Sequence, residues 1–533
     1  MKLRSDIVKV YKDVHIWVGI VAGLLLFIAF YAGAITMFEK PLERWATPPS
    51  RLAAPPPLAR APELVDAILT AHPEAAKNYA VVIETTPDLP ARVVWRERGE
   101  RRGQIKAFGA AFAADGSLQV ERLSAAPVAQ FVDTLHQKVG LPLPDSVARI
   151  LMGIVALLYG VALVSGVIIL LPTLAKDFFA LRIGRNIKRL WLDVHNALGI
   201  VSLPFHLVMA LTCVVFAFHD PFYDVQGKLV YPHGIQWGQE AEPAPPPPGT
   251  QPLSPTALLQ KVRQQLPGFR VDELGFQNDH GRLEGSVAGL DVRYGTRART
   301  YMRTHVDPYT GVVDPHDLPG HMDSWDTSVN AFFMLHFGSF GGNPVRWMYL
   351  LLGLAGALIF YTGNLLWIES RRKKQREAGL PEQKRSTRVL GSLTVGVALG
   401  CVAGISATIA ASKWLPAFAV NAAAWHEGIY YAVFVLCIAW ALLRGAARSA
   451  SELLWLAAFT TALIPLSSLL SALGVGGWNH PGAAIAVDAT ALVAVPLMLL
   501  VAGYSRRRLR DGHADSIWSG RAAAVPTVEP QTR

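Results

Sequence analysis

The chain has 533 residues and a net charge of +10 at pH 7; 51% of its residues are hydrophobic and only 17% are charged. Soluble domains carry about a quarter charged residues, so a soluble enzyme is excluded, and the 22 Phe, 14 Trp and 14 Tyr residues exclude a disordered chain. The three cysteines lie far apart in apolar stretches, so they form neither a zinc site nor a CxxCH haem-attachment site.

Eight apolar stretches are long enough to cross the hydrocarbon core of a membrane as helices, which takes about 20 residues each. In chain order they cover about residues 16–37, 150–171, 196–218, 347–368, 389–411, 428–443, 453–473 and 482–504. The first is not followed by a cleavage pattern, so it is predicted to be an uncleaved anchor rather than a signal peptide. The sequence therefore predicts a mainly α membrane protein with about eight transmembrane helices.

Basic residues are concentrated after the second, fourth, sixth and eighth stretches. By the positive-inside rule these loops and both termini face the cytoplasm. The basic excess then marks the inner leaflet of the bilayer, and a nucleic-acid partner is not expected. The predicted organisation is transmembrane helix 1 (1–37), a first outer module (38–149), helices 2 and 3 (150–218), a second outer module (219–346), helix 4 (347–368), a cytoplasmic basic loop (369–388), helices 5–8 (389–504) and a cytoplasmic tail (505–533).

Each outer segment has the pattern of a small α+β module. A Pro-rich linker comes first, PPSRLAAPPP in one segment and EPAPPPPG in the other. A helical pattern follows, PELVDAILTAHP or SPTALLQKVRQQLPG, and then short alternating strands with a hairpin signal, FAADGSLQV or VDPYTGVVD. The segment DPHDLPGHMDSWD could be a metal-binding or ferric-ligand site or a solvated loop, and the solvated loop is favoured.

The first four predicted spans are an internal duplication. KDVHIWVGIVAGLLL before span one matches LDVHNALGIVSLPFH before span three, which places His15 and His195 at equivalent positions. VDTLHQKVG before span two matches FFMLHFGSF before span four, which pairs His136 with His336. The unit of span, outer module and span occurs twice in parallel, so a pseudo-twofold axis along the membrane normal is expected.

The paired motifs DVHxxxG and LHxxxG…R…G, each flanking an outer module, resemble the PepSY-associated transmembrane proteins of bacteria. LPFHLVMALT and LHFGSFGGNP are similar to that family's usual sequences, and the resemblance covers about residues 1–370. It implies a bacterial inner-membrane protein with periplasmic PepSY modules and b-type haem in the span bundle, acting as a ferric-siderophore reductase. Residues 371–533 resemble nothing that we can name.

Histidines at membrane edges are costly and usually have a partner or a function. If the axis brings each pair face to face, His15 with His195 and His136 with His336 could hold two bis-histidine haem b groups, one near each leaflet. His206 has no counterpart, because Leu26 occupies the matching position; it could replace a ligand of either pair or bond to a haem edge. Alternatively, these histidines are ordinary interfacial residues. Four histidines at matched repeat positions argue against this alternative.

Arg149 and Arg346 are also repeat-equivalent and could bind haem propionates at the outer pair. In the C-terminal spans His426 and Glu427 begin span six, and Asp488 lies inside span eight, where an acid is a functional candidate or reaches water at the outer end.

Two classes of function are compatible with these patterns. The first is haem-dependent electron transfer across the membrane that reduces a periplasmic ferric siderophore. The cytoplasmic loops are too short for a flavin or nicotinamide domain, so the electron donor would be a membrane quinol or a separate cytoplasmic reductase. The second is a non-enzymatic membrane protein whose PepSY modules bind a peptide, a protease or a transporter. The matched histidines favour the first.

Overall fold

The computed structural model of the chain describes residues 4–86, 89–98, 105–123, 125–174, 187–229, 249–279, 282–291, 303–314, 324–379, 383–417, 421–475, 478, 485–513 and 516–520. The chain divides into two compact units. The helical unit comprises Met1–Ala46, Ala126–Asp220 and Met348–Arg533, and the sheet unit comprises Thr47–Ala125 and Pro221–Trp347.

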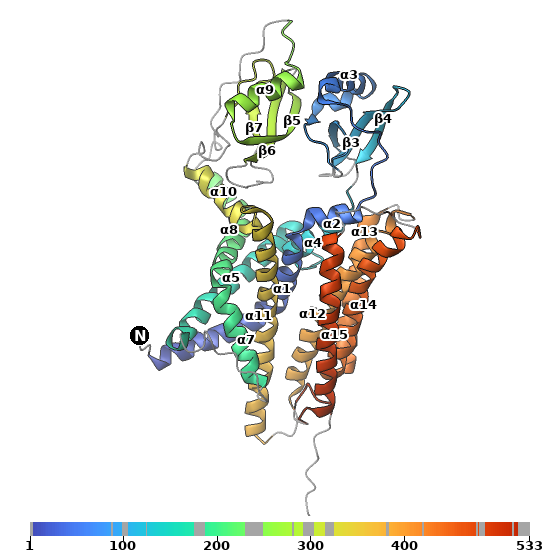
Figure 1. Ribbon diagram of the computed structural model, residues 1–533. Helices are drawn as coiled ribbons and strands as arrows, with labels where there is room; N and C mark the ends of the chain where they lie inside the picture. The colour runs from blue at the N-terminus through green and yellow to red at the C-terminus, as the bar shows by residue number, and fades with distance from the viewer. Residues whose placement is uncertain are drawn as a thin grey trace, which may run out of the picture. The chain divides into compact units, whose positions relative to one another are not determined.

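The helical unit is built from long apolar helices and two short ones (Figure 1). The short helices are α2 (Glu39–Ala46) and α4 (Val128–Lys138). The long helices, in chain order, are α1 (Ser5–Thr36), α5 (Asp145–Leu170), α7 (Ile187–Val201), α8 (Leu203–Leu229), α11 (Gly342–Glu377), α12 (Arg385–Ser412), α13 (Ala422–Arg444), α14 (Ala446–Ala472) and α15 (Ile485–Asp511). Parts of α8 and α11 belong to the sheet unit.

Eight helices of the described chain are long and apolar enough to cross a membrane. They are Asp6–Thr36, Asp145–Thr173, Leu203–Val225, Gly342–Glu377, Arg385–Ser412, Ala422–Arg444, Ala446–Ala472 and Ile485–Asp511. Each overlaps one predicted stretch, so the prediction of a mainly helical multi-pass membrane protein is confirmed.

Helix α12 is the most enclosed of the C-terminal spans and packs against both α13 and α14. Glycines let α13 approach it closely: a Cβ at Gly396 would lie 2.9 Å from Ile438 Cα, and one at Gly404 2.9 Å from the Tyr430 ring. The short helix α4 contacts α1, α12 and α13. It therefore connects the duplicated part of the bundle to the C-terminal spans.

The sheet unit contains one antiparallel sheet of seven described strands in the order β4-β3-β2-β1-β5-β6-β7. The strands are β1 (Tyr79–Val82), β2 (Val93–Arg98), β3 (Ile105–Phe112), β4 (Leu118–Leu123), β5 (Phe269–Asp279), β6 (Arg282–Asp291) and β7 (Arg303–Val306). Helices α3 (Ala61–Ala71) and α9 (Pro255–Gln265) bury Leu64, Ile68, Leu258 and Val262 in one core with strand residues such as Leu274.

Both predicted module helices and both predicted turns are confirmed. Helices α3 and α9 occupy the two helical patterns, β3 and β4 flank the turn at Asp115, and Val306 bridges to Val313 across the second turn. The expectation of two separate α+β modules is corrected, because β1 pairs with β5 from Tyr79 opposite Phe276 to Val82 opposite Glu273. This pairing makes one continuous sheet from both outer segments. Residues 315–323 of the segment DPHDLPGHMDSWD lie outside the described residues.

A short helix of the sheet unit, α10 (Ser324–Phe337), carries His336 and precedes α11.

Candidate functional site

His15 on α1 and His195 on α7 lie next to each other in the helical unit. Their ring centroids are 6.2 Å apart and their planes are nearly perpendicular, at 81°. Two imidazole nitrogens that bind one metal ion from opposite sides lie about 4 Å apart, because each bond is about 2 Å long. The ring centres then lie one ring radius further out on each side. The separation of the two rings is therefore in the range that one metal ion between them requires.

The hydrogen bonds of these two histidines fix which ring nitrogen carries the proton. His15 Nδ1 lies 2.8 Å from the carbonyl oxygen of Ala162 on α5, and His195 Nδ1 lies 3.1 Å from that of Ile359 on α11. A carbonyl oxygen only accepts, so each Nδ1 carries its hydrogen and donates it. No described residue forms a hydrogen bond to either Nε2 atom. Each ring thus keeps an Nε2 lone pair, the form in which imidazole binds metals.

The surroundings of these two rings repeat with the internal duplication. The ring of His15 lies beside Gly166, where an added Cβ would be 3.0 Å from Cε1; the ring of His195 lies beside Gly363 at 3.7 Å. In each case the accepting carbonyl is four residues before the glycine. The residue before the glycine is Ser165 or Thr362, whose hydroxyl lies 3.4 or 3.1 Å from Nδ1. The serine and the threonine are 197 residues apart, and so are the two glycines. Arg149 and Arg346 have the same offset.

His136 on α4 has surroundings of the same kind. We call this arrangement a glycine notch: a carbonyl oxygen beside Nδ1 and a glycine four residues later that leaves room for the ring. The Nδ1 of His136 lies 2.8 Å from the carbonyl oxygen of Ala29 on α1, and a Cβ added at Gly33, four residues later, would be 2.6 Å from Nδ1. The positions on α8 that match Ala29 and Gly33 by the offset of 180 are Met209 and Cys213. The glycine notch is therefore missing from the second half at this level, where the symmetry is broken.

His206 on α8 is the most enclosed of the five histidines, with 2% of its surface exposed. Its Nδ1 lies 2.5 Å from the hydroxyl oxygen of Tyr159, and that hydroxyl lies 3.1 Å from the carbonyl oxygen of His206. When the phenol donates to the carbonyl, it accepts the Nδ1 hydrogen, which gives His206 the same tautomer as the other rings. Its Nε2 atom is buried and has no partner among the described residues.

Contacts on two helices give the depth of His206 in the bundle. It touches Tyr159 on α5 and lies 3.1 Å from a Cβ added at Gly356 on α11. On its helix each contact point lies seven residues before the glycine beside His15 or His195. Seven residues correspond to about 10 Å of helix. Rings of Phe30, Phe205 and Phe360 surround this level, with Phe30 5.5 Å from the His206 ring centroid.

The remaining predicted residues lie in two environments. Arg149 on α5 is half exposed and forms an ion pair with Asp220, with Nη1 3.3 Å from Oδ2. His336, which is 8% exposed, and Arg346 belong to the sheet unit. The structure thus brings His15 and His195 together, whereas the pairing of His136 with His336 and the propionate role of both arginines stay predictions.

These rings fit a haem better than a bare metal ion. Within the described residues no group of three or more His, Cys, Asp or Glu side chains is placed to hold a metal. A haem requires only axial ligands, because the macrocycle supplies the others. The Nε2 lone pairs of His15 and His195, with the orphaned Nε2 of His206, are the donors that suit such a group.

Sequence reasoning missed the residues that orient these rings. Tyr159, Ser165, Thr362 and Gly363 were not singled out, although the SG and TG pairs recur at the offset of the matched arginines. That recurrence is the signal that would have found three of them. Tyr159 has no such signal, because its partner His206 has no repeat equivalent.

Comparison with known proteins was made for the whole chain. The family described as the PepSY-associated TM region matches residues 13–370, which is more than half of the chain. Among curated proteins no relative matches. The matched range contains all the histidines of the candidate site and the whole seven-stranded sheet and ends before α12. The chain therefore belongs to the PepSY-associated TM region family.

Proposed function

We propose that the protein carries electrons across the membrane through two haem b groups and reduces a ferric siderophore on its outer side. The observation that carries the proposal is that three histidine rings have the same hydrogen-bond partner at Nδ1 and the same neighbouring glycine. His15, His195 and His136 each have Nδ1 beside a carbonyl oxygen and a glycine four residues later. Binding of Nδ1–H to a backbone carbonyl is the usual outer-shell interaction of a metal-bound histidine.

Each histidine has a distinct place in this proposal. His15 and His195 would hold one haem near the inner leaflet, where an electron from the cytoplasmic side would enter. His136 and His336 are the ligands near the outer leaflet. His206, about 10 Å outward from the inner pair, is a third donor that replaces a ligand or bonds to a haem edge. When bound, a haem with two imidazole ligands takes up and gives up single electrons and leaves no coordination position for oxygen chemistry.

The outer side is where a bulky acceptor has room to bind. Both outer segments join in the sheet unit, whereas the cytoplasmic loops are short. A ferric siderophore holds Fe(III) through hard oxygen ligands, and one electron converts the ion to Fe(II), whose lower charge weakens that binding. One-electron delivery is therefore sufficient for iron release. Arg149 and Arg346 would bind haem propionates at the outer level.

The visible spectrum of the purified protein tests the proposal. We expect a Soret band and, after reduction, sharp α and β bands. His15→Ala or His195→Ala should remove about half of the haem, and His136→Ala or His336→Ala the other half. His219→Ala is the matched control, because His219 is an exposed histidine on α8 outside the repeat pattern. A folded but colourless protein would contradict the proposal and favour a PepSY-based binding protein for a peptide, a protease or a transporter.

A further inference from the structure

Helix α13 carries a buried histidine and a buried tyrosine that lack polar partners. His426 is 1% exposed, and neither of its ring nitrogens has a hydrogen-bond partner in the part of the chain that the structure describes. The hydroxyl oxygen of Tyr430 has no nitrogen or oxygen partner there and faces only the thiol of Cys401, and the side chain is fully buried. Residues four apart lie on one face of a helix. Burial of polar groups without partners is costly, so this pair calls for a ligand.

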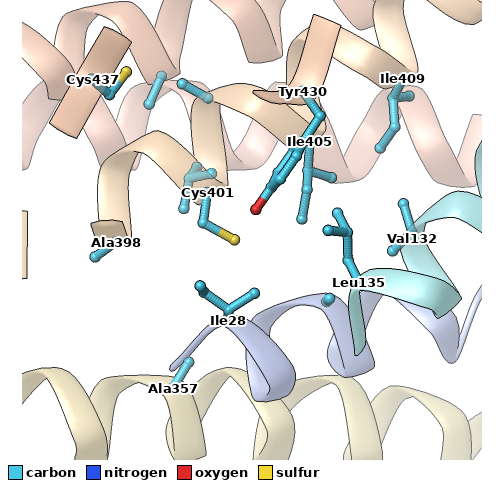
Figure 2. Packing of buried hydrophobic residues seen from close by; sticks show 14 of the residues in the cluster. Ile28, Val132, Leu135, Ala357, Ala398, Cys401, Ile405, Ile409, Tyr430 and Cys437 are labelled. Carbon is cyan, nitrogen blue, oxygen red and sulfur yellow. The ribbon is translucent and has the colours of Figure 1, made fainter. Parts of the chain in front are cut away.

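The surroundings of the pair are apolar. Figure 2 shows the Tyr430 hydroxyl pointing toward the sulfur of Cys401, a weak acceptor, with Ile405 beside the ring. The ring also lies beside two glycines: an added Cβ would be 2.9 Å away at Gly404 and 3.7 Å away at Gly140. A few polar groups among mainly apolar residues are typical of a binding site for a small organic ligand.

The pair lies at the outer end of its span and next to the duplicated bundle. His426 is the fifth residue of α13, and the side chain of its neighbour Trp425 is half exposed. The ring of Tyr430 packs on Phe131 of α4 with centroids 5.5 Å apart, and Leu135 belongs to the same cluster. The next residue on α4 is His136, so these residues separate the pair from the outer candidate haem ligand.

We propose that His426 and Tyr430 bind the head group of a membrane quinol, which is a second electron donor that supplies the outer level of the bundle directly rather than through His15 and His195. The inference rests on the proposed electron transfer and assigns a role to α12 and α13, which lie outside the family match. A quinol is a flat apolar ring with two oxygens, and its tail reaches the site from the bilayer. The ring nitrogen of His426 without a hydrogen accepts a hydrogen bond from one quinol hydroxyl, and Tyr430 donates to the other oxygen.

The oxidation balances in electrons and protons. One quinol becomes one quinone and loses two electrons and two protons. Bound haem groups would take up the two electrons, one electron each. The protons leave one after the other through the ring nitrogen of His426 to the outer solution, while Tyr430 keeps its own proton. Oxidation thus occurs on the same side of the membrane as the proposed reduction of the ferric chelate.

Binding and stability measured on the full chain in lipid nanodiscs test the inference. The variants are His426→Phe and Tyr430→Phe, and Tyr431→Phe is the control because its hydroxyl donates to the Gly140 carbonyl at 3.1 Å. The probe is decylubiquinone, whose binding quenches tryptophan fluorescence. We expect the dissociation constant of decylubiquinone to rise by up to about tenfold in the two site variants, which is the equivalent of one lost hydrogen bond. In the control it should be unchanged.

Thermal unfolding distinguishes a functional pair from a structural one. His426→Phe loses no hydrogen bond within the described part of the protein, and Tyr430→Phe loses only the weak contact with the Cys401 thiol, so both should unfold close to the temperature of the wild type, whereas Tyr431→Phe should unfold lower. Reduction of the haem by decylubiquinol should slow tenfold in the site variants, with reduction by dithionite unchanged.

Two results would overturn the inference: equal decylubiquinone binding in all four proteins, or loss of stability in the site variants with binding intact. Because binding and unfolding need no haem, a colourless protein that binds decylubiquinone through His426 would refute the proposed function and leave the quinol site standing.

Discussion

Replacement by alanine of each of the three glycines beside the histidine rings should weaken haem binding to different extents. Gly33→Ala places a Cβ 2.6 Å from Nδ1 and 2.8 Å from Cε1 of His136. Carbon atoms in contact prefer about 3.5–4.0 Å, so the ring must move by roughly 1 Å. Gly166→Ala brings a Cβ to 3.0 Å from His15, which requires about half of that movement. Gly363→Ala reaches only 3.7 Å from His195 and fits without movement.

The energetic cost of Gly33→Ala follows from two opposing effects. Overpacking costs about 1–3 kcal/mol, and displacement of the ring weakens the hydrogen bond to Ala29, which contributes about 1 kcal/mol. Better helix propensity returns about 1 kcal/mol. The helix-propensity gain acts on folding alone. If haem binding has to push the His136 ring back against the added Cβ, the overpacking cost of about 1–3 kcal/mol falls on binding and raises the haem dissociation constant roughly 5- to 150-fold at this site.

Haem titration of the apoprotein, followed by the Soret band, measures this series. We expect Gly33→Ala to weaken one of two binding phases strongly, Gly166→Ala to weaken the other modestly, and Gly363→Ala to resemble the wild type. Equal affinities in all three variants would refute the idea that these glycines make room for ligand rings. Unfolding of the Gly33→Ala protein before haem is added would show a packing defect instead, so apoprotein thermal stability is the control.

Three further predictions concern other buried groups. Tyr159→Phe leaves Nδ1 of His206 without a partner and should lower the free energy of unfolding by about 1–3 kcal/mol; an unchanged melting temperature would argue against this bond. Arg92 donates to the carbonyls of Pro56, Val82 and Ile83, so Arg92→Met should destabilise the sheet unit by about 3 kcal/mol, seen as faster proteolysis with an unaltered haem spectrum. Burial lowers the pKa of Lys413, so the unfolded chain binds its proton more readily and stability should rise as the pH increases toward 10.5. Lys413→Met should remove this rise in melting temperature; identical pH slopes would contradict the reasoning.

Local patterns predicted the elements of this fold well because each depends on nearby residues. Each of the eight apolar runs coincides with a helix of the described chain that is long and apolar enough to cross a membrane, and turn residues predicted the hairpin at Asp115. The pairing of β1 with β5 was missed because residues about 200 positions apart meet there, and nothing in either strand specifies the partner. The sheet therefore joins two segments that the sequence presents as separate modules.

The candidate site was predicted in part for a similar reason. Repetition in the sequence identified His15 and His195 as a pair, and the structure places their rings 6.2 Å apart. The groups that orient a ring depend on which helix face meets it, as for Tyr159 beside His206. The burial of His426 was equally invisible, since an apolar span does not reveal which of its faces packs inside.

Reoxidation of the reduced protein in oriented vesicles tests the central claim most directly. The protein is reduced with dithionite, excess reductant is removed, and a ferric siderophore is added on one side while the α band is followed. We predict that the α band decays, with one iron reduced per haem oxidised, only when the chelate is on the predicted periplasmic side. Decay only from the opposite side, or no decay with any ferric chelate, would contradict electron transfer to an outer ferric siderophore.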